Sequence, residues 1–287
     1  MQQKTLYLIV LGLLALVASS CTELGPPISF KDNSALLDTS YIDNNLPTNT
    51  YKKVVIEEFT GATCNNCPRG AETIKDILTK HPDSVFAIAI HNDNPLASPH
   101  SGAEDFRTAE GIQISQRLGG TAAIPSAGID RHKFPNTTQL VVFRSRWEGS
   151  VEDQLEKAPA VDLQLEQDFN ASTRELTVTA TIHYLRDVDT TTHLSIAITE
   201  DDIISPQTMP DLSVNQNYKH QHIFRTMLTP TFGLLTHPET VRGRVVIKSF
   251  RTTLPENWVA ANCNAVGFVH YIGDSDEILQ AEEIDIE

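Results

Sequence analysis

The sequence has 287 residues, of which 40% are hydrophobic and 21% are charged, and its formal net charge at pH 7 is −15. These fractions are close to those of globular proteins and argue against wholesale disorder, a fibrous repeat or a polytopic membrane protein. The acidic balance argues against a protein that binds nucleic acid through its phosphates. Four cysteines are too few for a small disulfide-stapled fold, so each cysteine is interpreted by its position.

The N-terminus has the pattern of a signal peptide, residues 1–20. Lys4 precedes an apolar run of 13 residues, Leu6–Ala18, which is shorter than the roughly 20 residues of a transmembrane helix. The junction before Cys21 resembles a bacterial lipobox, although Ala18 stands where leucine is usual. This resemblance implies lipidation of Cys21 and attachment to a membrane through acyl chains. The alternative is a secreted protein in which Cys21 is incidental.

Residues 21–50 contain several Gly, Pro and Asn residues without a sustained period, so we expect a tether. Residues 51–158 then alternate between strand-like and helix-like patterns, which is typical of an α/β domain. The expected strands are Lys53–Phe59, Val85–His91 and Ser126–Asp130, and the expected helices are Cys64–His81, Ala103–Leu118 and Arg144–Lys157.

Residues 159–287 change to alternating apolar and polar residues, as at Leu176, Val178, Ala180 and Ile182. This pattern predicts a second, all-β domain, a β-sandwich of the immunoglobulin or fibronectin kind. It carries 19 acidic and 8 basic side chains. Such an excess of acidic side chains keeps an exported surface soluble. The more specific alternative is that these side chains form a cation site or bind a basic partner.

The most specific signal is a pair of cysteines, Cys64 and Cys67, that follows a strand and opens a helix. Unpaired N–H groups at a helix N-terminus favour a thiolate, so Cys64 is the candidate nucleophile. Cys67 lies within disulfide reach and is expected to be the buried, resolving partner. Zinc would need a second cysteine pair, which is missing, so we expect no metal and no cofactor. Inert packing of both thiols is the remaining alternative.

This part of the chain resembles the thioredoxin superfamily over residues 51–158. The resemblance implies that Glu58, in the acid-aromatic pair with Phe59, accepts a proton from the resolving thiol, directly or through a water. It also implies a cis-proline at Pro125, which leaves the backbone of Ile124 free to pair with an extended substrate. Thr63 stands where thioredoxins carry tryptophan and is the second expected substrate contact.

Two departures from the thioredoxin pattern, Thr63 before the first cysteine and Asn65-Asn66 in place of the usual Gly-Pro, leave the redox potential and direction open. Between Val85–His91 and Pro125 the chain also holds more residues than a minimal domain needs, and this insertion either caps the site to select substrates or only packs against it. A narrower resemblance covers the entire chain, carried by the signal region and by residues 57–68, 220–229 and 263–269. These segments resemble the twenty-eight-kilodalton outer-membrane-protein family of bacterial lipoproteins. The resemblance implies an outer-membrane lipoprotein with a thioredoxin-like domain and a β domain.

Two weaker signals lie in the second half. His220 and His222, two residues apart on a strand, would form half of a metal site, and a complete site would need further histidines such as His270. Cys263 has no evident partner and is expected to be a buried free thiol, the alternative being a link to another protein.

Two functions therefore stay open. The first is a membrane-tethered thiol-disulfide oxidoreductase whose partner is an extended polypeptide or a disulfide-containing envelope protein. The second is a binding or structural lipoprotein in which the cysteines form a fixed disulfide and the thioredoxin-like part is only a scaffold.

Overall fold

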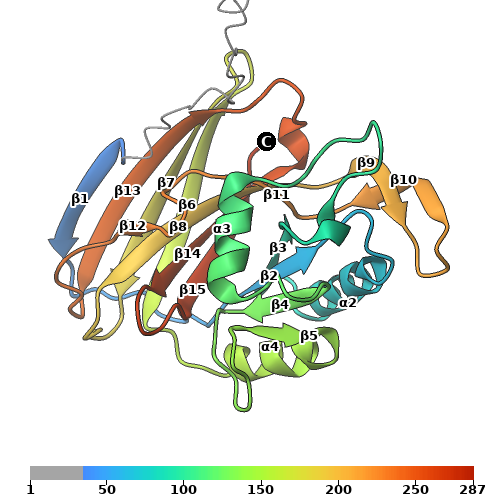
Figure 1. Ribbon diagram of the computed structural model, residues 1–287. Coiled ribbons are helices and arrows are strands. Elements are labelled where there is room, and N and C mark those ends of the chain that lie inside the picture. Colours follow the sequence, from blue (N-terminus) through green and yellow to red (C-terminus); the bar gives the residue numbers. More distant parts are fainter. Residues whose placement is uncertain (1–34) are drawn as a thin grey trace, which may run out of the picture. The chain divides into compact units, whose positions relative to one another are not determined.

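The computed structural model describes residues 35–287 (Figure 1). The expected signal peptide, Cys21 and residues 21–34 of the expected tether lie outside the described residues. The strands are β1 (Leu37–Ile42), β2 (Val54–Thr60), β3 (Val85–His91), β4 (Ser126–Ile129), β5 (Val141–Phe143), β6 (Val161–Asn170), β7 (Glu175–Tyr184), β8 (Thr192–Glu200), β9 (Ile203–Thr208), β10 (Val214–His220), β11 (Ile223–Met227), β12 (Leu234–Leu235), β13 (Arg244–Thr253), β14 (Cys263–Tyr271) and β15 (Ile278–Asp285). The helices are α2 (Cys67–Lys80), α3 (Ala109–Leu118) and α4 (Trp147–Leu155), with short 3-10 helices at η1 (Pro95–Ala97), η2 (Arg144–Arg146) and η3 (Ala260–Asn262).

The first part of the described chain is an α/β arrangement built on four strands in the order β3-β2-β4-β5. β3 is parallel to β2, whereas β4 is antiparallel to β2 and β5 is antiparallel to β4. Every residue of β2 and β3 is buried, because the sheet is covered on both faces. One face packs on α2 and α4 through Ile74, Ile77 and Trp147, and the other face packs on α3 through Ile114 and Leu118.

The sheet does not end with the first part. β11 pairs with β3 at Ile223 and Ala89, and β8, β14 and β15 continue the same sheet, with β12 paired to β8. Sequence patterns divide the chain after residue 158, but strands from both sides of that point are hydrogen-bonded in one sheet, and residues 35–287 belong to one compact unit.

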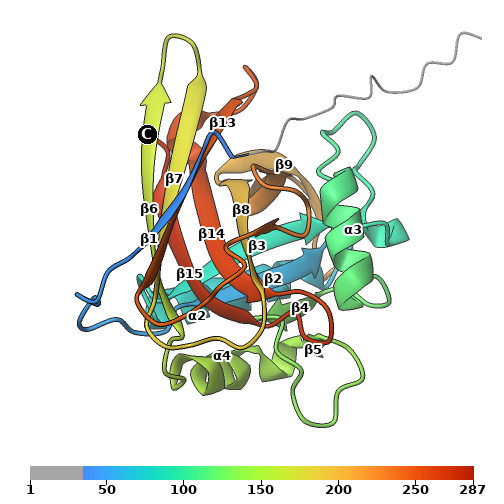
Figure 2. The same cartoon turned by 90° about the vertical axis from the view of Figure 1, so that its left-hand side faces the viewer.

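A second sheet has four strands in the order β1-β13-β7-β6. Its buried face contributes Val178, Ile182 and Val246 to an apolar core that also contains Ile196 and Ala265 of the larger sheet. The two sheets therefore face each other across a shared core (Figure 2). Alternation of buried and half-buried residues along β7 is the period-two pattern seen in the sequence.

β1 corrects one expectation, because residues 37–42 form a strand paired with β13 rather than part of a tether. β1 is mostly exposed, so its sequence shows no apolar alternation and its position depends on backbone hydrogen bonds. All three expected helices also begin later than expected, at Cys67 rather than Cys64, at Ala109 rather than Ala103, and at Trp147 rather than Arg144. The expected mixture of α/β and β structure is confirmed, and strands predominate over helices among the described residues. None of the described helices has the length and apolar character to cross a bilayer.

β9 and β10 form a separate two-stranded sheet, which we call the β9–β10 hairpin, residues 203–220. β10 is exposed along most of its length, and the hairpin belongs to neither larger sheet. In Figure 1 it lies at the end of the molecule occupied by α2 and β3. The hairpin therefore belongs to the second half of the sequence but lies beside the first.

Candidate functional site

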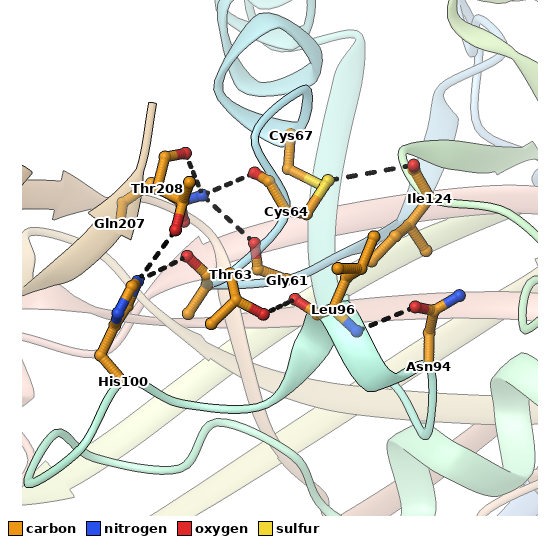
Figure 3. Close-up of a disulfide and its surroundings, with 11 residues drawn as sticks. Gly61, Thr63, Cys64, Cys67, Asn94, Leu96, His100, Ile124, Gln207 and Thr208 are labelled. Carbon is orange, nitrogen blue, oxygen red and sulfur yellow. Dashed lines mark hydrogen bonds between the residues drawn. A yellow bond between two sulfur atoms is a disulfide. The ribbon is translucent and has the colours of Figure 1, made fainter. Parts of the chain in front are cut away.

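Cys64 and Cys67 form a disulfide with a Cα–Cα distance of 5.4 Å (Figure 3). Cys64 lies in the turn after β2, and Cys67 is the first residue of α2, whose N-cap is Asn66. The Cys67 N–H donates to the Cys64 carbonyl oxygen at 3.4 Å. The helix therefore begins three residues later than the sequence predicts, because the turn and Pro68 fix its first residue at Cys67.

Both cysteines are sealed from solvent, with exposed fractions of 1% for Cys64 and 2% for Cys67. Burial of Cys67 agrees with the prediction. Burial of Cys64 corrects the expectation of an accessible nucleophile, since a catalytic thiol must meet its substrate. The cover comes from segments that lie far from Cys64 in the sequence.

The β9–β10 hairpin is the first of two segments that pack against the turn carrying Cys64. The buried side-chain amide of Gln207 donates to the carbonyl oxygens of Cys64 at 2.9 Å and Gly61 at 3.2 Å. Next to it, the Thr208 N–H donates to the Ala62 carbonyl oxygen at 2.9 Å. The hairpin thus binds the backbone of the turn that carries Cys64, as Figure 3 shows.

The segment between β3 and α3 is the second segment that packs against this turn. The Thr63 N–H and hydroxyl both donate to the Leu96 carbonyl oxygen, at 3.1 and 2.9 Å. His100 Nε2 lies 3.2 Å from both the Ala62 carbonyl oxygen and the Thr208 hydroxyl. Thr63, an expected substrate contact, is therefore bonded within the chain in this closed arrangement.

The expected cis-proline is present, because the Ile124–Pro125 peptide bond is cis. The Ile124 carbonyl oxygen lies 3.9 Å from Cys64 Sγ. Both loop residues are half-buried, so this side of the disulfide lies nearer to solvent than the hairpin side. The structure brings Ile124 and Pro125 together with the cysteines, as the sequence predicts.

Glu58 is buried at 2% exposure, and its Oε1 has no hydrogen-bond partner among the described residues. Burial raises the pKa of Glu58 to about 8. A Cβ added at Gly70 of α2 would come within 2.4 Å of Glu58 Oε1, and it would also lie close to Pro125 and Trp147. Glu58 therefore points under the first turns of α2, toward the cis-proline.

Cys67 and Glu58 share a small cavity of about 30 Å³, which Gln207, Tyr218 and His220 also line. Burial raises the pKa of Tyr218 to about 12, and the charge of Glu58 adds to this effect. Sequence patterns did not identify Gln207 or Tyr218. Neither lies in a recognisable motif, and both reach the site only through the hairpin.

His220 and His222 do not form the expected half of a metal site. β10 ends at His220, and His222 has a positive φ of 56°, so the two side chains do not share a strand face. His220 instead packs on Tyr218 and on Phe106, which also contacts His91. No group of three metal-ligating side chains occurs within residues 35–287.

Cys263 is a buried free thiol, as expected. Burial raises its pKa to about 12, with a smaller contribution from Glu200. A thiol of this kind stays protonated at neutral pH and takes no part in exchange.

The chain is similar to one family and to several solved structures, among them three bacterial proteins. The sequence profile of outer membrane protein Omp28 matches residues 113–286. HBP35 of Porphyromonas gingivalis is similar with a TM-score of 0.64 at 16% identity, covering 82% of this chain and 76% of that one. This similarity establishes a shared fold. Comparison with curated proteins gives no significant match.

The other two structures are more distant. A protein of Agrobacterium tumefaciens solved in a structural genomics programme has a TM-score of 0.48 at 15% identity, covering 83% of this chain and 96% of that one. A domain of the outer membrane lipoprotein Omp28 from Porphyromonas gingivalis has a TM-score of 0.31 at 15% identity, covering 46% and 91%.

Proposed function

The chain belongs to the Omp28 family of outer membrane proteins, and we propose that this member is a thiol-disulfide exchange protein whose dithiol is gated by the β9–β10 hairpin. The observation that carries the proposal is the placement of the Cys64–Cys67 disulfide between the Ile124 carbonyl and the cavity that Glu58 shares with Cys67. Outer-membrane localisation follows from the family.

The exchange step needs a partner dithiol or disulfide. In the oxidised form, a partner thiolate attacks Cys64 Sγ, the Cys64–Cys67 bond breaks, and Cys67 leaves as a thiolate. A second partner thiolate then attacks the partner sulfur of the mixed disulfide and releases Cys64. The partner is oxidised by two electrons and the Cys64–Cys67 pair is reduced. The reverse sequence reduces a partner disulfide.

Glu58 supplies the proton chemistry of this step. With its pKa near 8, the carboxyl is protonated at neutral pH and can donate a proton to the leaving Cys67 thiolate. The cavity that the two residues share has room for one water molecule to relay that proton. An unpartnered buried carboxyl destabilises a fold, so a role in proton transfer explains its presence better than packing does.

Access to Cys64 requires the hairpin to move. The hairpin is a separate two-stranded sheet, and among the described residues Gln207 and Thr208 bond it to residues 61–64. Elements with few such bonds open locally at a lower free energy than the core. We propose that release of residues 61–64 from the hairpin lets Cys64 move toward the more open side of the disulfide, which faces Ile124.

The fold supports this function. The strand order β3-β2-β4-β5 supports a thioredoxin-like arrangement of residues 51–158. In the chain, α2 follows β2 and the cis-proline directly precedes β4, as this arrangement requires. The two facing sheets support a β-sandwich in the second part. A lipid on Cys21 would attach both to the outer membrane. Incorporation of a clickable palmitate into the wild type but not into Cys21→Ala tests this anchor.

Trapping of a mixed disulfide tests the exchange proposal. Full-length protein in detergent is mixed with a glutathione-derived disulfide peptide, and adducts are identified by mass spectrometry. We expect reduced Cys67→Ser to accumulate an adduct at Cys64, and Cys64→Ser to accumulate none. Cys263→Ser is the matched control and should exchange like the wild type. Exchange that persists in Cys64→Ser would overturn the proposal.

The second candidate function is a non-catalytic lipoprotein with a fixed disulfide. The burial of both cysteines favours it. It predicts that the disulfide resists reduction until the whole protein unfolds, whereas gating predicts reduction through a local opening. The denaturant dependence of the reduction rate separates the two, because global unfolding has a much larger dependence on denaturant.

A further inference from the structure

A surface of different character lies on the open side of the disulfide. A hollow of about 370 Å³ is lined by Asn66 and Arg69 of the α2 end, by Ile124 and Pro125, and by Phe143 and Arg144 of the β5 end. A second hollow, of about 310 Å³, adjoins it at Phe143 and is bounded by Arg146. We call Arg69, Phe143, Arg144 and Arg146, with the outer edge of β5, the β5 surface.

The β5 surface is positively charged, although the protein is strongly acidic. None of Arg69, Arg144 and Arg146 forms an ion pair with a described residue, and all three are exposed. Arg144 donates to the Thr73 hydroxyl at 3.1 Å, which holds it toward α2. Three unpaired arginines on one surface attract an anionic partner.

Phe143 adds an apolar contact between the two hollows. Its side chain is 68% exposed, one of the most exposed large apolar side chains among the described residues. It lies directly opposite Ser126 in the β4–β5 register, beside the cis-proline. An aromatic side chain of this kind can anchor a protein contact when a partner buries it.

β5 also offers backbone groups to a partner. It is the last strand in its sheet, so its outer edge has no strand partner within residues 35–287. Backbone N–H and C=O groups at such an edge can pair with an extended polypeptide. A lipid headgroup or a free phosphate could bind the arginines, but it could not form strand-like hydrogen bonds with the outer edge of β5.

We propose that the β5 surface binds an extended, acidic polypeptide segment that carries an apolar side chain next to its acidic residues. This inference rests on the proposed function, since it names the class of polypeptide whose cysteines would reach Cys64. The acidic side chains would pair with the arginines, the apolar side chain would contact Phe143, and the backbone would follow β5.

Fluorescence anisotropy with a peptide that lacks cysteine tests the binding without requiring exchange. The probe is a fluorescein-labelled twelve-residue peptide in which glutamate and threonine alternate around a central tyrosine, and its lysine counterpart is the control. We expect full-length protein in detergent to bind the acidic peptide at least about tenfold more tightly than the basic one. The preference should weaken between 0.15 and 0.5 M NaCl as the charges are screened.

Variants locate the binding surface. We expect the triple variant Arg69→Gln, Arg144→Gln, Arg146→Gln to lose the acidic preference, and Phe143→Ser to weaken binding of the acidic peptide. Arg242→Gln, an exposed arginine of the loop before β13, is the matched control and should bind like the wild type. Equal affinity for the two peptides, or full affinity in the triple variant, would overturn the proposal. Displacement of the peptide by phosphatidylglycerol vesicles, lost in the triple variant, would also overturn it in favour of a lipid surface.

The mixed-disulfide assay separates this proposal from the proposed function. If the protein prefers the acidic peptide but forms no adduct at Cys64, the β5 surface is supported and the exchange function is contradicted. If an adduct forms at Cys64 but the protein has no preference for the acidic peptide, the exchange function is supported and the β5 surface is contradicted.

Discussion

Glu57 and Glu58 are neighbours in β2 and both are buried, yet they have different environments. Glu57 accepts two hydrogen bonds of 2.7 Å from the Arg131 guanidinium, a buried ion pair on one face of the sheet. Glu58 points to the other face, toward α2, where Oε1 has no partner among the described residues. The side-chain alternation of a strand therefore separates an ion-paired carboxylate from a buried carboxyl that has no ion pair.

Replacement of the ionisable Glu58 carboxyl by a neutral amide should stabilise the fold at neutral pH, because the carboxyl ionises more readily in the unfolded chain. The folded pKa of about 8 lies above the ordinary value of 4.5, so Glu58 contributes stability that is complete below pH 4.5 and lost as the pH rises toward 8. We expect Glu58→Gln to unfold at a higher urea concentration than the wild type at pH 7, by about 3 kcal/mol. The two proteins should be similar at pH 4. Urea titrations that gave the same difference at both pH values would contradict this account.

The buried histidines should produce the opposite pH dependence. Burial lowers the pKa of His91 to about 3 and that of His220 to about 4. Their contribution to stability is therefore complete above about pH 6.5 and lost as the pH falls toward 4. We expect His91→Phe to lose less stability than the wild type between pH 6.5 and 4.5, measured by urea unfolding. His237→Phe, in the loop after β12, is the control, and an equal gain there would argue against the assignment.

At the level of elements, the turn that carries Cys64 depends on a hairpin from the other half of the chain. Gln207 lies 143 residues from Cys64 in the sequence and donates to its carbonyl oxygen. The local motifs, which are the two cysteines, Glu58 and Pro125, could be predicted because each lies within a strand-turn-helix or loop pattern. The cover could not be predicted, because a polar hairpin carries no signal that names the surface on which it packs.

Loss of the Gln207 amide should open the site. We expect Gln207→Ala to speed reduction of the Cys64–Cys67 disulfide by dithiothreitol, and to destabilise the fold by about 1 to 2 kcal/mol through the loss of its buried hydrogen bonds to the carbonyl oxygens of Gly61 and Cys64. Gln164→Ala in β6 removes an exposed hydrogen bond to Asp162 and is the matched control. An unchanged reduction rate in Gln207→Ala would show that the hairpin does not gate the disulfide.

The whole molecule is organised by one long sheet that joins the two halves of the sequence. Sequence patterns identified the α/β half and the β half, but they did not show that one sheet joins the two. The joint is a single parallel bridge between β3 and β11, and such a pairing leaves no periodic pattern in the sequence. The continuous sheet places the β9–β10 hairpin against residues 61–64, the turn that carries Cys64. Localisation at the outer membrane then places this buried disulfide in the envelope, where disulfides persist.

The shared sheet predicts cooperative unfolding. We expect residues 35–287 to unfold in one calorimetric transition, and an isolated fragment of residues 51–158 to lack the protected amides of β3, whose neighbour β11 is removed. Hydrogen exchange of the fragment and the full chain checks this. A fragment with protection equal to that of the full chain would show that the two halves fold independently.

The reduction potential of the Cys64–Cys67 pair in the full-length protein tests the central claim most directly. Equilibration with glutathione buffers, followed by alkylation and mass analysis, measures it in Cys263→Ser. An exchange protein predicts a value between about −120 and −270 mV. A value below about −300 mV is that of a structural disulfide and would contradict the account.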